Sequence, residues 1–373
     1  MRLLRALSCG AAIVLVLLSQ SLVAQRRRPA ASPTPTPQVP NTTRDEPATA
    51  PTQAGGGQTS TMGATPAAQR ITFENALSNL KFREIGPATM GGRIDDIEAV
   101  PGDPRTVYVA TAAGGILKTT NGGTSWNFVF TNESVSSIGD IAITPSNPSI
   151  VWAGTGEANN RQSSSWGNGI YKSMDAGKTW KRMGLENTMH IGRIVIDPHN
   201  PNIVFVAAEG NLWGPSPDRG VYRTTDGGRT WQQVLKINED TGASDIAIDP
   251  ESPTTLYAAA YQRRRTVWGF NGSGPGGGLY KSIDGGDTWT RLTKGMPYDA
   301  ESAPNPKAEG LLETGRNAIA VYPKDPNIVY ALIEHANGGI FRSTDKGETW
   351  TRMSDITQDP RPMLLLADTR RSE

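Results

Sequence analysis

An octapeptide that recurs five times constrains the fold of this chain more than any other feature of its 373 residues. Each copy follows the pattern Ser/Thr-x-Asp/Asn-x-Gly-x-Thr/Ser-Trp, and the copies are Thr119–Trp126, Ser173–Trp180, Thr224–Trp231, Ser282–Trp289 and Ser343–Trp350. Their tryptophans lie 54, 51, 58 and 61 residues apart. A repeat of this length is typical of one four-stranded blade of a β-propeller.

The octapeptide predicts a closed hairpin turn. Its acidic or amide side chain can accept hydrogen bonds from turn N–H groups, and its glycine allows a positive φ. We therefore expect a structural role for Asn121, Asp175, Asp226, Asp284 and Asp345. A large indole covers each turn while its N–H finds a partner, which assigns the same role to Trp126, Trp180, Trp231, Trp289 and Trp350.

The remainder of each repeat predicts three further strands. An alternating segment such as Ile194–Ile196 runs into a proline, and a β-branched and aromatic segment such as Ile203–Val206 follows a second proline. A third strand leads into the octapeptide, whose tryptophan opens a fourth. We predict an all-β propeller of four-stranded blades, with five blades present in an incomplete ring of about seven.

Composition divides the chain into four parts. A basic start, an apolar run and small residues predict a signal peptide over 1–24, and hence export to the periplasm or the extracellular space. Residues 25–70, rich in Pro, Thr and Gly, predict a disordered linker. The propeller is expected over 71–360. Residues 361–373 fit no repeat, and we interpret them as an irregular, out-of-frame tail that the nucleotide sequence would test.

The octapeptide resembles the Asp-box, or BNR, repeats of sialidases, xyloglucanase-type glycoside hydrolases and sortilin/VPS10 receptors. The lead-in Phe82–Pro87, followed by Gly91–Ile94, is most similar to secreted bacterial proteins with a sortilin N-terminal-type domain. The resemblance covers about residues 80–360. It implies the propeller fold, but proteins with this repeat include enzymes, receptors and assembly factors.

The alternative function, an N-terminal fragment of a secreted glycoside hydrolase similar to xyloglucanases or sialidases, lacks a complete site in the sequence. Where the resemblance to xyloglucanase-type enzymes would place a catalytic aspartate, Thr111–Gly115 has Ala112, which can neither donate nor accept a proton. Glu209 and Glu334 occupy equivalent repeat positions and are the best acid/base candidates. Two blades separate them, so rim carboxylates that are solvated or ion-paired are the favoured interpretation.

Loop composition favours ligand binding instead. Three successive connections between second and third strands are long, and topology puts them on one face, opposite the octapeptide turns. Exposed Trp and Arg are typical of binding hot spots and carbohydrate platforms. The alternative is that each tryptophan folds back onto its own blade. The candidate ligand-binding residues are Trp166, Trp213, Trp268, Arg161, Arg219 and Arg264.

Net charge and residue spacing limit the classes of partner and cofactor that the chain is expected to bind. The net charge of +1 argues against nucleic acid, and after signal cleavage no integral membrane span is expected. The only cysteine, Cys9, lies in the signal, and the three histidines match no metal spacing, so we expect neither metal nor cofactor. Charged residues at four strand starts (Asp96, Asp140, Arg193 and Asp245) are expected to line a central channel, where they pair with one another or hold water. A peptide, protein or carbohydrate ligand is the remaining class, and oligomeric state is left open.

Overall fold

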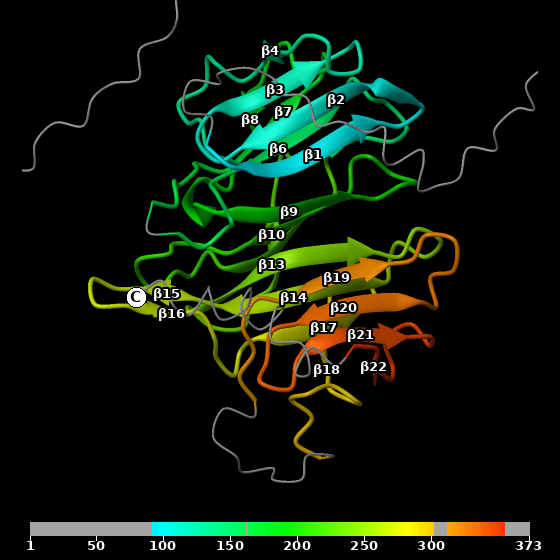
Figure 1. Cartoon of the computed structure of the whole chain (residues 1–373). Coiled ribbons are helices and arrows are strands. Elements are labelled where there is room, and N and C mark those ends of the chain that lie inside the picture. Colours follow the sequence, from blue (N-terminus) through cyan, green and yellow to red (C-terminus); the bar gives the residue numbers. More distant parts are fainter. Residues whose placement is uncertain (1–91, 162, 302–311, 355–373) are drawn as a thin grey trace, which may run out of the picture. The chain divides into compact units, whose positions relative to one another are not determined.

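The computed structural model describes residues 92–161, 163–301 and 312–354. The predicted signal peptide, linker and tail lie outside these residues. Five four-stranded antiparallel sheets follow one another along the chain (Figure 1). Within each sheet the strands are hydrogen-bonded in sequence order, as the repeat predicts for a propeller blade. Apart from one turn of 3-10 helix, Glu186–Thr188, the regular structure of the described residues is all β.

The bounds of the strands fall where the repeat places them. The first blade contains β1 (Ile94–Val100), β2 (Asp103–Thr111), β3 (Gly115–Thr119) and β4 (Asn127–Phe128). The second contains β5 (Ile138–Ile143), β6 (Val151–Thr155), β7 (Ile170–Ser173) and β8 (Lys181–Arg182). The third contains β9 (Ile191–Ile196), β10 (Val204–Ala208), β11 (Gly220–Thr224) and β12 (Gln232–Leu235).

The fourth blade carries an insertion. It contains β13 (Thr241–Ile248), β14 (Leu256–Gln262), β17 (Gly278–Ser282) and β18 (Thr290–Leu292). Between its second and third strands, β15 (Arg264–Arg265) and β16 (Phe270–Asn271) form a separate small hairpin. The fifth blade contains β19 (Ala318–Val321), β20 (Val329–Ile333), β21 (Gly339–Ser343) and β22 (Thr351–Arg352).

Each octapeptide forms the turn between the third and fourth strands of its blade, and its acidic or amide side chain accepts hydrogen bonds within that turn. In the second copy, Asp175 Oδ1 accepts the N–H of Thr179 at 2.8 Å and the Ser173 hydroxyl at 2.8 Å. The backbone N–H of Thr179, its hydroxyl and the Ser173 hydroxyl lower the pKa of Asp175 to about 2. Gly177 adopts φ 85° and donates its N–H to the Ser173 hydroxyl at 2.7 Å. In this copy the acidic side chain therefore accepts hydrogen bonds within its own turn.

Blades pack face to face through apolar side chains. The second strand of each of the first four blades carries an aromatic residue that is at most 1% exposed: Tyr108, Trp152, Phe205 and Tyr257. Each lies in a buried cluster with side chains of a neighbouring blade. A large aromatic removed from such a site leaves a cavity costing about 3–5 kcal/mol. The core is therefore distributed over the blade interfaces.

A second, polar contact joins successive blades through the octapeptide turn. The basic residue before the end of the third strand reaches the turn of the following blade. Lys118 Nζ donates to the Ala176 carbonyl at 2.8 Å, and Arg223 Nη1 donates to the Gly285 carbonyl at 2.7 Å. Lys172 makes the equivalent bond to the Gly227 carbonyl at 3.1 Å. The turns of the second, third and fourth blades thus close their own hairpins and also anchor the preceding blade.

Candidate functional site

Three long loops between second and third strands carry the predicted tryptophans. They join β6 to β7, β10 to β11 and β14 to β17, so the antiparallel strand order places them at the ends opposite the octapeptide turns. Trp166, Trp213 and Trp268 are 68%, 52% and 92% exposed. The three indoles face solvent rather than folding back onto their own blades.

A buried polar network ties these three loops together. Glu209 follows β10 directly and forms an ion pair with Arg263, which follows β14, at 2.6 Å between Oε2 and Nη2; both side chains are fully buried. Arg263 Nη1 also donates to the Ala158 carbonyl at 3.1 Å and to Asn160 Oδ1 at 2.8 Å. Asn160 in turn donates to the Tyr261 hydroxyl at 2.6 Å. One guanidinium therefore fixes the starts of all three loops.

Of the predicted arginines, Arg219 is placed differently from the expectation. It is fully buried rather than solvent-facing, because it donates to the carbonyls of Glu209 (2.7 Å), Asn211 and Gly214 (3.3 Å). Burial lowers its pKa to about 10, with nearby Arg263 the next cause. Arg219 thus shapes the loop that presents Trp213, which corrects its assignment as a solvent-facing side chain.

Arg161 and Arg264 lie nearer solvent. Arg161 is exposed, and Arg264 is 34% exposed and forms an ion pair with Asp240. Alternation along the segment explains the difference from its neighbours, because Arg263 and Arg265 are buried on either side of Arg264. The Arg265 guanidinium lies 4.8 Å from the centre of the Phe270 ring, and the backbone N–H of Arg265 donates to the Leu212 carbonyl. The β15–β16 hairpin is thereby attached to the neighbouring loop.

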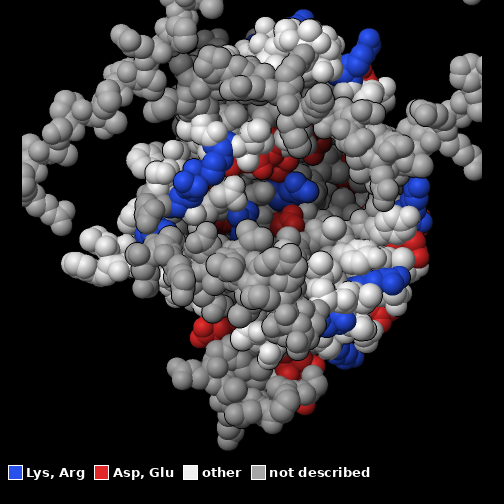
Figure 2. All heavy atoms as spheres, viewed as in Figure 1, with Lys and Arg blue, Asp and Glu red and all other residues white. Residues whose placement is uncertain are grey.

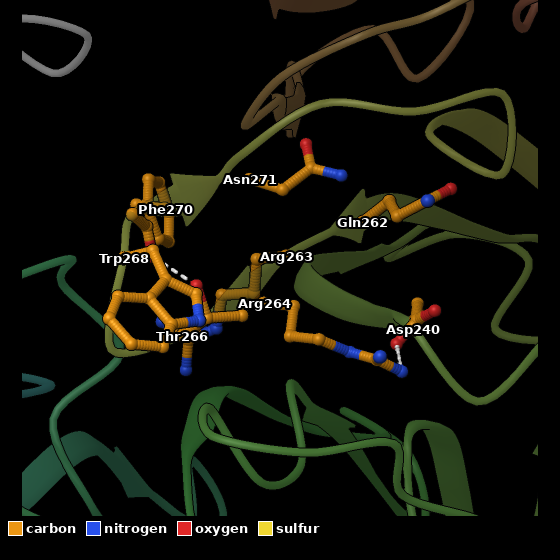
Figure 3. Close-up of a pocket in the computed structure, with 9 residues that line it drawn as sticks. Asp240, Gln262, Arg263, Arg264, Thr266, Trp268, Phe270 and Asn271 are labelled. Carbon is orange, nitrogen blue, oxygen red and sulfur yellow. Dashed lines mark hydrogen bonds and ion pairs between the residues drawn. The ribbon is translucent and has the colours of Figure 1, made fainter. Parts of the chain in front are cut away.

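A pocket of about 370 Å³ lies beside this hairpin (Figure 3). Trp268 stands at the hairpin tip, while Gln262, Arg264 and Asp240 line the other side of the pocket. A smaller recess of about 320 Å³ lies beside Trp166, next to Glu133–Ser137. An exposed indole next to amide, carboxylate and guanidinium groups can stack on a flat apolar surface and hydrogen-bond its polar edge.

The predicted strand-start charges surround a central hollow in which acidic and basic side chains gather (Figure 2). Asp96 accepts the N–H of Ile141 at 3.1 Å, Asp140 that of Ile194 at 2.7 Å, and Asp245 that of Ile319 at 3.0 Å. Each acid thus anchors the first strand of the next blade.

In the third blade, Arg193 replaces the aspartate. Its guanidinium lies 3.4 Å from Asp140 and 3.6 Å from Asp245. Arg193 therefore pairs with two of the three acids, Asp140 and Asp245.

One carboxyl in this hollow was missed by the sequence reasoning. Burial raises the pKa of Asp95 to about 6, although Asn159 donates to its Oδ1 at 2.9 Å. Arg316 Nη1 donates to Asn159 Oδ1 at 2.7 Å, so the group belongs to a chain of polar contacts across the hollow. Asp95 and Asp96 are adjacent in the sequence but differ in role. Asp96 accepts a backbone N–H of the next blade, whereas Asp95 belongs to the polar contacts of the hollow, and the sequence alone does not distinguish the two.

The acid/base candidates occupy equivalent blade positions, as predicted, but have different surroundings. Glu209 is buried against Arg263, whereas Glu334 is half-buried and its Oε2 accepts the N–H of Arg316 at 2.8 Å. His190 is buried and hydrogen-bonds through Nδ1 to the Glu157 carbonyl at 2.8 Å; burial holds its pKa well below the usual value. Within the described residues there is no metal-ligating cluster of His, Cys, Asp and Glu, and no helix has the length and apolarity to cross a membrane.

Comparisons of sequence and of structure with known proteins both support the fold. The family model for sortilin, neurotensin receptor 3, matches residues 168–298. A probable oligoxyloglucan-reducing end-specific xyloglucanase of Neosartorya fischeri is 25% identical over 59% of this chain and 27% of its own length. A xyloglucanase of a Paenibacillus species is 25% identical over 72% of this chain and 27% of its own length.

A solved structure adds the geometric likeness. The crystal structure of an ancestral GH74 enzyme matches 72% of this chain and 32% of its own chain, at 22% identity and a TM-score of 0.53. The chain spans about a quarter of the length of the two curated xyloglucanases above. The protein is a blade-based β-propeller, similar over part of its length to the sortilin family model and to xyloglucanases.

Proposed function

We propose that this protein is an exported, non-catalytic binding module that takes a peptide, protein or glycan ligand across its three-loop face. The observation that carries the proposal is the joint exposure of Trp166, Trp213 and Trp268 on successive loops. Tryptophan is among the residues most enriched at the energetic centres of binding surfaces. Export rests on the predicted signal peptide.

The buried network around Arg263 holds the three loops in an ordered conformation, which favours ligand binding. Because Arg263 is fully buried and holds groups of all three loops, the indoles are presented by an ordered backbone. A ligand that meets ordered loops does not have to bear the entropic cost of fixing them. The charged side chains beside the indoles, Arg161, Arg264 and Asp240, supply polar contacts at the edge.

Binding arrays of peptides and of neutral and acidic glycans test the proposal on the full chain. The double variant Trp213→Ala/Trp268→Ala is expected to lose about tenfold or more in affinity for the best binder, with an unchanged unfolding midpoint, because exposed side chains contribute little to stability. Tyr322→Ala removes an exposed aromatic from the opposite end of a blade and serves as the control. Equal affinity of the double variant and wild type would count against a ligand surface that includes these two indoles.

A glycoside hydrolase is the second candidate, and the likeness to xyloglucanases is the observation that favours it. Glu209 and Glu334 are its acid/base candidates from the sequence, and Asp95 joins them because a pKa of about 6 suits a proton donor near neutral pH. Incubation with β-glucan and sialoside substrates tests this. Turnover that disappears in Glu334→Gln or Asp95→Asn, with folding retained, would replace the binding proposal.

A further inference from the structure

The start of the first long loop contacts blades on other sides of the central hollow. We call its residues 157–160 the loop root; they follow β6 of the second blade. Within the root, the Asn159 side chain donates to Asp95 Oδ1 of β1 at 2.9 Å and accepts a hydrogen bond from Arg316 Nη1, just before β19, at 2.7 Å. One amide therefore links the second blade to the first and to the fifth.

The other three residues of the loop root are also bound by other blades. The Glu157 side chain is 1% exposed and forms an ion pair with Arg93, just before β1. Arg263, which follows β14 of the fourth blade, donates to the Ala158 carbonyl at 3.1 Å and to Asn160 Oδ1 at 2.8 Å. The loop root is therefore the segment through which the three-loop face is attached to the hollow.

Asp95 has less compensation for a negative charge than the neighbouring acids of the hollow. Asp96, Asp140 and Asp245 each accept a backbone N–H of the next blade. Among the described residues, Asp95 accepts the Asn159 amide alone and forms no ion pair, and its Oδ2 is buried without a hydrogen-bond partner. A buried carboxylate oxygen without a donor disfavours the charged form of the group.

The electrostatic surroundings of Asp95 agree with this geometry. Burial is the largest cause that raises the pKa of Asp95 to about 6, and it outweighs the opposing effects of the Asn159 hydrogen bond and of the charges of Arg93 and Arg316. The other charged groups around Asp95 are Asp96, Glu98, Asp140, Glu157, Arg161, Arg193 and Asp245.

The loop root lines the same hollow as Asp95, through Ala158 and Asn159. Release of the root would admit water to the carboxyl and return its pKa toward the ordinary 3.8. A proton on Asp95 therefore favours the attached root, and ionisation of Asp95 favours its release.

We propose that protonation of Asp95 stabilises the attachment of the loop root across the hollow, so that the three-loop face is ordered when Asp95 is neutral and loosens when Asp95 ionises. The inference rests on the proposed ligand surface, because it assigns control of that surface to the hollow. A ligand that requires ordered loops is then bound more tightly in mildly acidic solution than at neutral pH.

Hydrogen exchange of the unliganded full chain at about pH 5 and about pH 7, corrected for the intrinsic exchange rates, tests this proposal. A pKa of about 6 in the attached root and of 3.8 after release makes the opening equilibrium about tenfold larger at the higher pH. Residues 156–161 are therefore expected to exchange about tenfold faster there. The octapeptide turn of the same blade is expected to stay unchanged, because its hydrogen bonds lower the pKa of Asp175 to about 2.

Asp95→Asn keeps an acceptor oxygen but cannot ionise, so its loop root is expected to exchange at the slow rate at both pH values. Glu98→Gln is the matched control. Burial, with the charge of Asp96 the next cause, raises the pKa of Glu98 to about 7, but among the described residues Glu98 makes no hydrogen bond to the loop root. This variant is expected to keep the pH dependence of wild type.

The proposal is overturned if the wild-type root exchanges no faster at the higher pH, if Asp95→Asn keeps the wild-type pH dependence, or if Glu98→Gln loses it. Because the measurement uses no ligand, its result is separate from that of the binding arrays. A chain that binds nothing in the arrays but shows this exchange pattern would refute the ligand surface and retain the switch.

Discussion

Replacing Arg263 by methionine tests whether a buried ion pair holds the three-loop face together. Arg263 and Glu209 are both fully buried, and the pair joins the segment after β14 to the segment after β10. Methionine keeps the apolar stem but leaves the Glu209 carboxylate buried without its counter-charge. It also removes the donors to the Ala158 carbonyl and Asn160 Oδ1.

The expected loss is about 3–5 kcal/mol in the free energy of unfolding, the range for breaking a buried ion pair from one side. Urea denaturation at neutral pH measures it as a lower midpoint with an unchanged slope. The double variant Glu209→Gln/Arg263→Met is expected to be more stable than Arg263→Met alone, because no unpaired carboxylate remains buried.

Arg264→Met is the control, because Arg264 pairs with Asp240 at the surface next to Arg263 in the sequence. A partly exposed pair contributes about 0–1 kcal/mol, so this variant should unfold close to wild type. The reasoning is refuted if Arg263→Met and Arg264→Met lie within about 1 kcal/mol of each other, since burial would then not distinguish the two pairs.

Three further predictions concern carboxyl groups. The pKa of Asp175 is held near 2 in the folded chain against an ordinary 3.8, so its contribution to stability is present above pH 4 and lost as pH falls toward 2; Asp175→Asn should show less of this acid loss in thermal melts. The pKa of Asp95 is shifted in the opposite direction, to about 6, so ionisation of Asp95 lowers the stability of the folded chain as pH rises from 4 through 6. The stability of Asp95→Asn relative to wild type should therefore be higher at pH 7 than at pH 4. Asp140→Ala leaves the Ile194 N–H without its acceptor and should cost about 1–3 kcal/mol in urea unfolding, whereas Asp140→Asn, which retains an acceptor oxygen, should cost less.

Local interactions explain why the fold was predictable from the sequence. The octapeptide bonds join residues two or four positions apart, as between Ser173, Asp175 and Thr179, so the pattern alone indicates the turn. The four-stranded blade followed from the same repeat, and the observed strand order agrees with it.

The surroundings of the candidate site could not be predicted in the same way. Glu209 and Arg263 lie 54 positions apart in the sequence and meet only because adjacent blades pack. Arg219 was expected at the surface, but its loop curls around it and supplies three carbonyl acceptors. The alternation that buries Arg263 and Arg265 while leaving Arg264 half-exposed was the one available signal in that segment.

Hydrogen exchange with and without the best binder from the arrays tests the central claim, that three successive loops act as one ligand surface. The account predicts slower exchange in loops 156–169, 210–220 and 262–278 together, with the octapeptide turns at the opposite ends unchanged. Protection confined to the octapeptide turns, or to the central hollow around Asp95 and Arg193, would contradict it.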